Sequence, residues 1–322
     1  MSALSSKVPI PGPEVNMEHQ HEEAPTEWDL WNALPNLEGI ERARACFDLS
    51  GFTFENGQYM KSLTLAEEAR DTYLEFDDKY GYAHSLATVA FSLYSLNRKE
   101  EGALEMMKTV MVFKEIGAKE EWEHRGYLAS WFKDLEDLSG AREQYVKCLE
   151  HFEYEENAAK IALLSQQIGF VDCQLGSCED AIAQYKRSRE VYGMLKDVRQ
   201  VAETDIHLAR CYNHQGDGST AEMHATKAIA VFDSVGIRDK RAQAYSQLGK
   251  AKNTQKDYEA ALRAFEKAHE LVSNVREVNY YALTTVQKGM AKAFRGLGRD
   301  SEANEVDARN EVINETLKWE SV

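Results

Sequence analysis

Proline is scarce in this sequence and confined to one end. All five prolines, at positions 9, 11, 13, 25 and 35, lie in the first 35 residues, and the 287 residues from Asn36 to Val322 contain none. A proline inside a helix costs about 3 kcal/mol, because its ring removes a hydrogen bond and clashes with the preceding turn. Ala, Glu, Lys, Leu and Gln, which favour helices, fill the segments between the breaks. The sequence therefore predicts an all-α protein.

Long hydrophobic runs are also absent. No segment approaches eighteen consecutive apolar residues, and the N-terminus has no basic region followed by an apolar run. The five cysteines are odd in number and form no regular framework, so we expect reduced thiols. Cys173 and Cys178 have no matching second pair, which favours small buried side chains over a zinc site. These features predict a soluble, cytoplasmic protein.

The motifs by which most catalytic and metal sites are recognised are missing as well. The sequence contains no Gly-rich phosphate loop, HExxH, GxSxG or paired metal-ligand motif. His207 and His214 lie seven residues apart, with Glu203 and Asp205 just upstream. A polar patch lining a groove is favoured there over a metal or acid–base cluster. We therefore expect no cofactor, no metal and no enzymatic activity.

What the chain does contain is a small residue that recurs about every forty positions. The seven members are Ser62, Ala103, Ala141, Ala181, Ala221, Ala261 and Ala303. A second, mostly small residue stands twelve positions before each of them, at Ser50, Phe91, Ala129, Gly169, Ala209, Gly249 and Ala291. Small side chains let two helices approach closely, so each pair predicts a crossing of two consecutive helices. A fixed period of this length is typical of stacked repeat proteins.

This period predicts a single elongated domain, an α-solenoid of about seven antiparallel helix pairs. We expect a disordered tail at residues 1–26, because that segment is rich in proline and polar residues. Residues 27–35 are expected to cap the first repeat, and residues 305–322 to form a C-terminal capping helix. The repeats between them are expected at 36–78, 79–118, 119–157, 158–197, 198–238, 239–276 and 277–304.

The segment from Gln243 to Leu271 resembles a tetratricopeptide repeat. The resemblance rests on Leu248-Gly249, Tyr258, Ala261, Phe265 and Ala268. The resemblance extends over residues 40 to 310, and the first, second and last repeats match less well. In the second repeat Phe91 replaces the usual small residue, and in the last repeat Asp307 stands where an apolar residue is expected. What the resemblance implies is a right-handed superhelix of antiparallel helix pairs.

The spacing of about 40 residues is longer than the 34 that is usual in this family. Repeats of this length resemble those of kinesin light chains, of scaffold proteins that bind GoLoco motifs, and of Gram-positive peptide-pheromone receptors. That resemblance implies an adaptor or scaffold that binds a protein or peptide on its concave face, without catalysis. The alternative it leaves open is a regulator whose superhelix changes conformation when a peptide binds.

The resemblance also places the first helix of each pair on the concave face. Early repeats offer there Gly51, Phe54, Ser92, Ser95 and Leu96. Late repeats offer polar and basic residues instead, at Arg210, Asn213, His214, Lys250, Asn253, Lys288, Lys292 and Arg295. In the longer-repeat relatives, asparagines at such positions hold the main chain of a peptide, which makes Asn213 and Asn253 the foremost candidates.

Charge changes along the chain in the same direction. Residues 1–200 carry 21 Lys+Arg against 36 Asp+Glu, whereas residues 201–300 carry 15 against 12. The late groove is thus expected to bind an acidic or C-terminal peptide segment, unless its cations simply pair with nearby acids. A net charge of −16 disfavours nucleic acid and anionic membrane as the main partner. The oligomeric state stays open.

Overall fold

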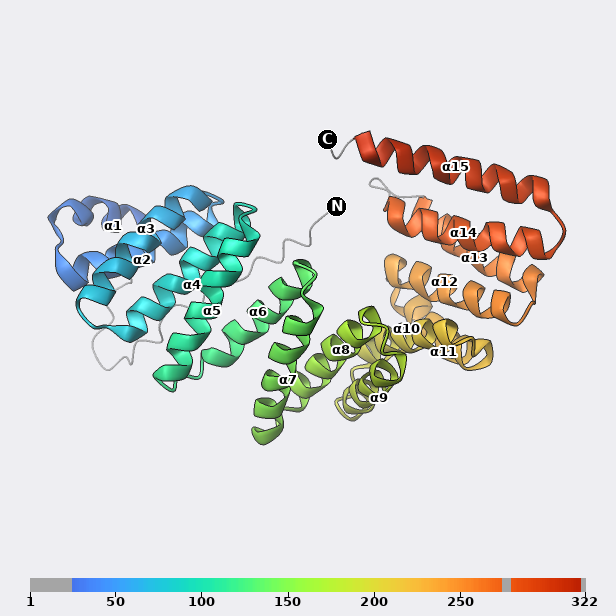
Figure 1. Ribbon diagram of the computed structural model, residues 1–322, viewed down its shortest axis with the longest axis horizontal. Coiled ribbons are helices and arrows are strands. Elements are labelled where there is room, and N and C mark those ends of the chain that lie inside the picture. Colours follow the sequence, from blue (N-terminus) through green and yellow to red (C-terminus); the bar gives the residue numbers. More distant parts are fainter. Residues whose placement is uncertain (1–24, 274–278, 320–322) are drawn as a thin grey trace. The chain divides into compact units, whose positions relative to one another are not determined.

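The computed structural model describes residues 25–273 and 279–319. These residues form fifteen α-helices and one short 3₁₀-helix and include no β-strand (Figure 1). The prediction of an all-α fold is confirmed. The expected N-terminal tail lies outside the described residues, apart from its last two positions.

The chain divides between Cys148 and Leu149 into two compact units, where the sequence suggested one elongated domain. The helices pack mainly on their neighbours along the chain. A solenoid built in this way has no single central core, so it can divide at one of its helices. Here the division falls within helix α7, which runs from Leu138 to Tyr154.

The first unit begins with a short segment that covers the open end of the first helix pair. Its elements are α1 (Glu27–Ala33), η1 (Leu34–Asn36), α2 (Gly39–Glu55), α3 (Tyr59–Glu75), α4 (Lys79–Ser95), α5 (Lys99–Glu115), α6 (Glu121–Asp134) and the start of α7. Leu30 of α1 is buried against α2 and α3, and Lys61 of α3 lies over the Trp31 ring. The segment therefore supplies the apolar cover that the first pair needs.

The second unit continues the alternation of first and second helices. It contains the end of α7, then α8 (Ala158–Gln174), α9 (Cys178–Met194), α10 (Val198–Gln215), α11 (Gly218–Val235), α12 (Arg238–Thr254), α13 (Tyr258–Ser273), α14 (Tyr280–Gly296) and α15 (Asp300–Trp319). Within each unit, consecutive helices pack as antiparallel pairs. The first helices begin about forty residues apart, which confirms the predicted solenoid of seven helix pairs.

Short polar side chains cap several of the first helices. Asp78, Asn157, Asp197 and Asn279 precede α4, α8, α10 and α14, and each accepts a hydrogen bond from the backbone N–H three residues further on. Such a cap satisfies one of the free N–H groups of the first turn and stabilises a helix by about 1 kcal/mol. These residues fix where the first helices start.

The recurrent small residues mark the helix crossings, as predicted. In the first pair, the Ser62 hydroxyl donates to the Ser50 backbone carbonyl over 2.8 Å. In the fourth pair, a Cβ added to Gly169 would lie 3.2 Å from the Ala181 carbonyl oxygen. Contacts this short between backbones are possible only where both side chains are small.

Phe91 breaks the small-residue pattern, yet α4 and α5 still pack closely. A Cβ added to Gly102 would lie 2.9 Å from the Ala90 carbonyl oxygen and 3.0 Å from the Tyr94 nitrogen. The close approach has therefore moved by one residue on each helix, to Ala90 and Gly102. The Phe91 ring fills a cluster with Ala103 and other apolar residues and is only 5% exposed.

Helix α15 runs unbroken across the expected boundary between the last repeat and a capping helix, at 304–305. No glycine or proline interrupts it, and Ala303, Val306 and Asn310 are buried at helical spacing. Asp307, which stands where an apolar residue was expected, forms an ion pair with Arg295 of α14. A single helix therefore both completes the seventh pair and extends beyond it.

None of the helices within the described ranges combines the length and the apolar character that crossing a membrane requires.

Candidate functional site

Three consecutive first helices of the second unit, α10, α12 and α14, line a cavity of about 380 Å³. Seven of the eight predicted groove residues line it: Arg210, Asn213, His214, Lys250, Asn253, Lys288 and Lys292. Sequence reasoning missed four others, Gln247, Thr254, Thr285 and Gly289. We call this site the basic cavity.

Helix stacking explains why residues forty positions apart meet here. Helix α12 contacts both α10 and α14 directly, in addition to its own partner α13. Positions that are equivalent in successive repeats therefore fall on one surface, as Asn213 and Asn253 do. Lys288 and Lys292 are four residues apart on α14, which places them on the same face of that helix.

The basic cavity contains four cations and no acid. Arg210, Lys250, Lys288 and Lys292 line it, and no lining residue is Asp or Glu. Within the described part of the chain, none of these four forms an ion pair or a side-chain hydrogen bond with a carboxylate. Other cations of the same unit do pair, for example Lys252 with Glu222 over 2.6 Å. Among the described residues, no carboxylate therefore neutralises these four cations.

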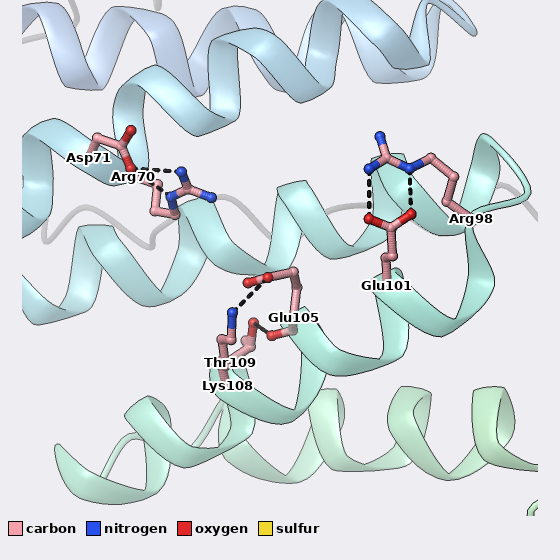
Figure 2. Close-up of polar contacts among 7 residues, drawn as sticks. All are labelled: Arg70, Asp71, Arg98, Glu101, Glu105, Lys108 and Thr109. Carbon is pink, nitrogen blue, oxygen red and sulfur yellow. Dashed lines mark hydrogen bonds and ion pairs between the residues drawn. The ribbon is translucent and has the colours of Figure 1, made fainter.

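The first unit shows the ordinary arrangement of surface cations for comparison. On α3 and α5, Arg70 pairs with Asp71 and Lys108 with Glu105 (Figure 2). Arg98 makes two hydrogen bonds of 2.7 Å to the Glu101 carboxylate in the same view. Each partner lies within three residues of the cation, so these side chains neutralise one another locally.

Lys250 and Arg210 are half-buried, whereas Lys288 and Lys292 are exposed. The pKa of Lys250 is lowered, first by burial, which penalises the charged ammonium group, and then by the positive charge of Arg210. Keeping Lys250 charged therefore raises the free energy of the unbound protein. A negatively charged group placed beside Lys250 and Arg210 would remove that cost.

The two asparagines of the basic cavity form matching bridges between repeats. Asn213 Nδ2 donates to the Gln247 carbonyl oxygen over 3.0 Å, and Asn253 Nδ2 donates to the Gly289 carbonyl oxygen over 3.0 Å. Gln247 and Gly289 occupy equivalent positions in successive repeats, two residues before the small residue of their helix. Each bridge thus ties one first helix to the next.

The other half of each amide has no partner. Asn213 Oδ1 and Asn253 Oδ1 are buried, and neither accepts a hydrogen bond from any described residue. A buried acceptor without a donor is costly, by about 1–3 kcal/mol. The two asparagines thus each hold an unsatisfied acceptor that is shielded from solvent, one repeat apart, and a ligand could reach these oxygens only if the side chains rotated.

Arg295, the eighth predicted residue, does not line the basic cavity. Its guanidinium instead pairs with Asp307 of α15. The ion pair with Asp307, and not a different face of α14, holds this side chain away from the basic cavity. Arg295 is thus an ordinary paired surface cation.

The candidate cluster around His207 is dispersed. His207 stacks on Tyr185 at 5.1 Å, and burial lowers its pKa to about 3, so this imidazole is neutral. Asp205 accepts hydrogen bonds from Arg189 and His224 in the core, and His214 faces the basic cavity. Glu203 pairs with Lys240. Among the residues that the structure describes, no three His, Cys, Asp or Glu side chains form a group able to hold a metal.

Two of the five early groove positions, Phe54 and Ser92, are occupied by packing contacts. Ser92 is fully buried, and its hydroxyl lies 3.0 Å from that of Ser62. Phe54 packs on Tyr59 and Phe91. These two residues are therefore parts of the core of the first unit, and the expectation that Ser92 faces a groove was wrong.

Comparison with known proteins agrees with this fold. The family model described as "Tetratricopeptide repeat" matches residues 200–271 and 240–308. Superkiller protein 3 of Schizosaccharomyces pombe is 25% identical over 264 residues, which are 80% of this chain and 18% of that protein. The chain thus spans less than a fifth of the length of this curated relative.

Two solved structures show similar arrangements of helices. One is a STAND protein (signal transduction ATPase with numerous domains) from Pyrococcus horikoshii, which has a tetratricopeptide repeat sensor. Its TM-score is 0.68 at 15% identity, and the match covers 91% of this chain and 45% of that one. The other is the apo form of the quorum sensor NprR from B. thuringiensis, with a TM-score of 0.54 at 14% identity over 89% of this chain and 97% of that one. Residues 200–308 of the present chain therefore match the tetratricopeptide repeat model, and the similar solved structures show the same kind of helix-pair fold.

Proposed function

We propose that this protein is a non-catalytic adaptor or scaffold whose basic cavity binds an acidic, extended segment of a partner protein or peptide. The observation that carries this proposal is the set of four cations, Arg210, Lys250, Lys288 and Lys292, without a carboxylate partner. Arg210 and Lys250 are half-buried, and a charge that is partly removed from water without a counter-ion raises the energy of the free protein, whereas Lys288 and Lys292 are exposed and add to the positive potential. Charge-assisted hydrogen bonds from a ligand carboxylate would offset that energy.

The net charge of the chain supports a localised acidic ligand over a large polyanion. The protein carries −16 overall, so a nucleic acid or an anionic membrane would be repelled by most of the surface. A short acidic segment that enters the basic cavity would be attracted by its four cations more strongly than it is repelled by the more distant acidic surface. Electrostatic steering of this kind raises the association rate and depends on salt.

The asparagine amides support an extended peptide as the ligand. Asn213 Oδ1 and Asn253 Oδ1 lack donors and stand one repeat apart. The backbone of a peptide carries an N–H donor at nearly every residue, and an amide that rotates away from its bridge to the next helix would let its oxygen accept from that donor. A single small anion would leave both oxygens unsatisfied.

The test is binding of a labelled peptide of consecutive glutamates, measured by fluorescence anisotropy against a glutamine peptide of the same length. We expect Lys250→Glu with Lys292→Glu to weaken glutamate-peptide binding at least about tenfold, which corresponds to about 1.4 kcal/mol. The matched control is Lys227→Glu with Lys256→Glu, which changes the charge equally at exposed positions outside the basic cavity. Asn213→Ala with Asn253→Ala should weaken binding too, while thermal melts show that all variants remain folded. Equal loss in the cavity and control variants would overturn the proposal.

A second candidate function is peptide-responsive regulation, and the two asparagine bridges favour it. Asn213 and Asn253 each tie a first helix to the next, and both line the basic cavity. A peptide that competes for these amides would break the bridges and change the spacing of α10, α12 and α14. Small-angle scattering with and without the glutamate peptide separates the two functions, because an adaptor keeps its radius of gyration and a regulator of this kind does not.

A further inference from the structure

Two thiols from consecutive repeats lie against each other in the second unit. Cys211 of α10 is fully buried within an apolar cluster of α9 and α10, and Cys173 of α8 packs against that cluster from outside. Cys173 keeps part of its surface exposed. A hydrogen bond between the two thiols is the largest single influence on the ionisation of both. The pair thus has one accessible sulfur and one enclosed sulfur in direct contact.

We propose that Cys173 and Cys211 are a redox-sensitive pair, in which a peroxide oxidises Cys173 and Cys211 then closes an inter-repeat disulfide. The site lies outside the basic cavity, and neither cysteine lines it. The proposal therefore stands independently of the function proposed above.

The surroundings of the pair favour a thiolate on the accessible sulfur. The pKa of Cys173 is lowered, mainly because Cys211 donates a hydrogen bond to its sulfur, with a further contribution from the positive charge of Arg210. The pKa of Cys211 is raised, because it holds the shared proton and is buried. The thiolate is the nucleophilic form of cysteine, so Cys173 is the sulfur that reacts first.

The chemistry requires two steps. In the first, the Cys173 thiolate attacks one oxygen of hydrogen peroxide, an S–O bond forms, the O–O bond breaks, and hydroxide leaves to become water. Cys173 is now a sulfenic acid, oxidised by two electrons. In the second step, the Cys211 sulfur loses its proton and attacks the Cys173 sulfur. The S–S bond forms, the S–O bond breaks, and the departing hydroxide takes that proton as a second water.

The remaining cysteines of the chain lack this arrangement. Cys46 is fully buried, and burial raises its pKa to about 12, so its thiolate does not form at neutral pH. Cys148 is buried too, and its thiol donates to the Trp122 carbonyl over 3.6 Å. Cys178, at the start of α9, is the nearest competitor for Cys173. The experiment must therefore distinguish Cys178 from Cys211.

The test uses the full-length protein treated with hydrogen peroxide, alkylated with iodoacetamide, digested with trypsin and examined by mass spectrometry. A Cys178→Ser variant is included, because Cys173 and Cys178 lie in one tryptic peptide, between Lys160 and Lys186. We expect a cross-link between residues 161–186 and 211–227 in both proteins, which dithiothreitol reverses. In Cys211→Ser, we expect dimedone to label Cys173 and no cross-link to form.

Two results would overturn the proposal. One is a peroxide-treated native protein in which Cys173 and Cys211 remain alkylated as readily as before. The other is a disulfide that joins Cys173 to Cys178, or one that appears only between chains on a non-reducing gel. The native protein alone supplies both readouts, so the outcome does not depend on whether a serine variant folds.

Discussion

The ring of Phe265 offers a sharp test of how the repeats pack. Phe265 of α13 is fully buried between a glycine of α12 and a glycine of α14. A Cβ added to Gly249 would lie 2.8 Å from Phe265 Cδ2, whereas ordinary van der Waals contact begins at 3.4 Å. The ring has no room to move away, because the backbone of Gly289 on α14 lies close to its other side. A Cβ added to Gly289 would come even closer to the ring than one added to Gly249. We therefore expect Gly249→Ala to strain this contact.

The magnitude follows from two opposing effects. Overpacking a filled core costs about 1–3 kcal/mol. Replacing glycine by alanine inside a helix stabilises the folded state by about 1 kcal/mol, because alanine has the higher helix propensity. The net expectation for Gly249→Ala is a loss of about 1 kcal/mol. Gly193 is the matched control, because it is helical in the same unit and an added Cβ there meets nothing within 4 Å. Gly193→Ala should gain up to about 1 kcal/mol.

A double-mutant cycle isolates the contact with the ring. Phe265→Leu alone should destabilise the unit by about 1–2 kcal/mol, since it removes buried carbons. In that background Gly249→Ala should no longer be unfavourable, so the two changes should be non-additive by at least about 1 kcal/mol. Urea unfolding followed by circular dichroism measures the global effect. Hydrogen exchange in α12 and α13 measures the local effect, because repeats can open separately.

The reasoning would be refuted if Gly249→Ala were as stabilising as Gly193→Ala, or if the effects of Gly249→Ala and Phe265→Leu simply added. Either result would mean that α12 and α13 can separate without cost, and that the small residue at this position does not determine the helix crossing.

Three further expectations concern stability. Burial and the neighbouring His124 lower the pKa of His84 from 6.5 to about 4. The contribution of His84 to the free energy of unfolding should therefore be constant above pH 6.5 and fall by about 3 kcal/mol between pH 6.5 and 4. The urea midpoint should fall less steeply across this range in His84→Gln. Gly102→Ala should lower the thermal midpoint, because its Cβ would meet the Ala90 carbonyl at 2.9 Å. Asn253→Ala should cost no more than about 1 kcal/mol in urea unfolding, since the variant loses one hydrogen bond but also removes an unsatisfied oxygen.

Much of the fold could be predicted from local features of the sequence. The absence of proline after Pro35 and the forty-residue period of small residues are properties of the chain itself, and both lead to helix pairs of fixed length. Ser50 and Ser62 show why the period is informative, since the short Ser62 side chain lets its hydroxyl reach the Ser50 carbonyl oxygen where the two helices cross. The position of Gly102 was harder to recognise, because the crossing moved by a single residue when Phe91 replaced the small residue.

The candidate site could be predicted in its composition but not in its bonding. Counting from the small residue of each first helix identified seven residues that line the basic cavity. Pairing depends on distances between helices, which spacing along one helix does not give. Arg295 was therefore predicted at the groove although Asp307, on the next helix, holds it elsewhere.

The sequence by itself determined the helices, their pairing and the concentration of basic residues after residue 200, because these follow from propensity, period and composition. The tertiary structure decided which cations lack a counter-ion, since that depends on whether an acid from another helix comes within reach. It also decided the state of Asn213 and Asn253, whose amide nitrogens bind the next helix and whose oxygens have no donor. The contact of Cys173 with Cys211, 38 residues apart, likewise arises only when α8 and α10 pack together.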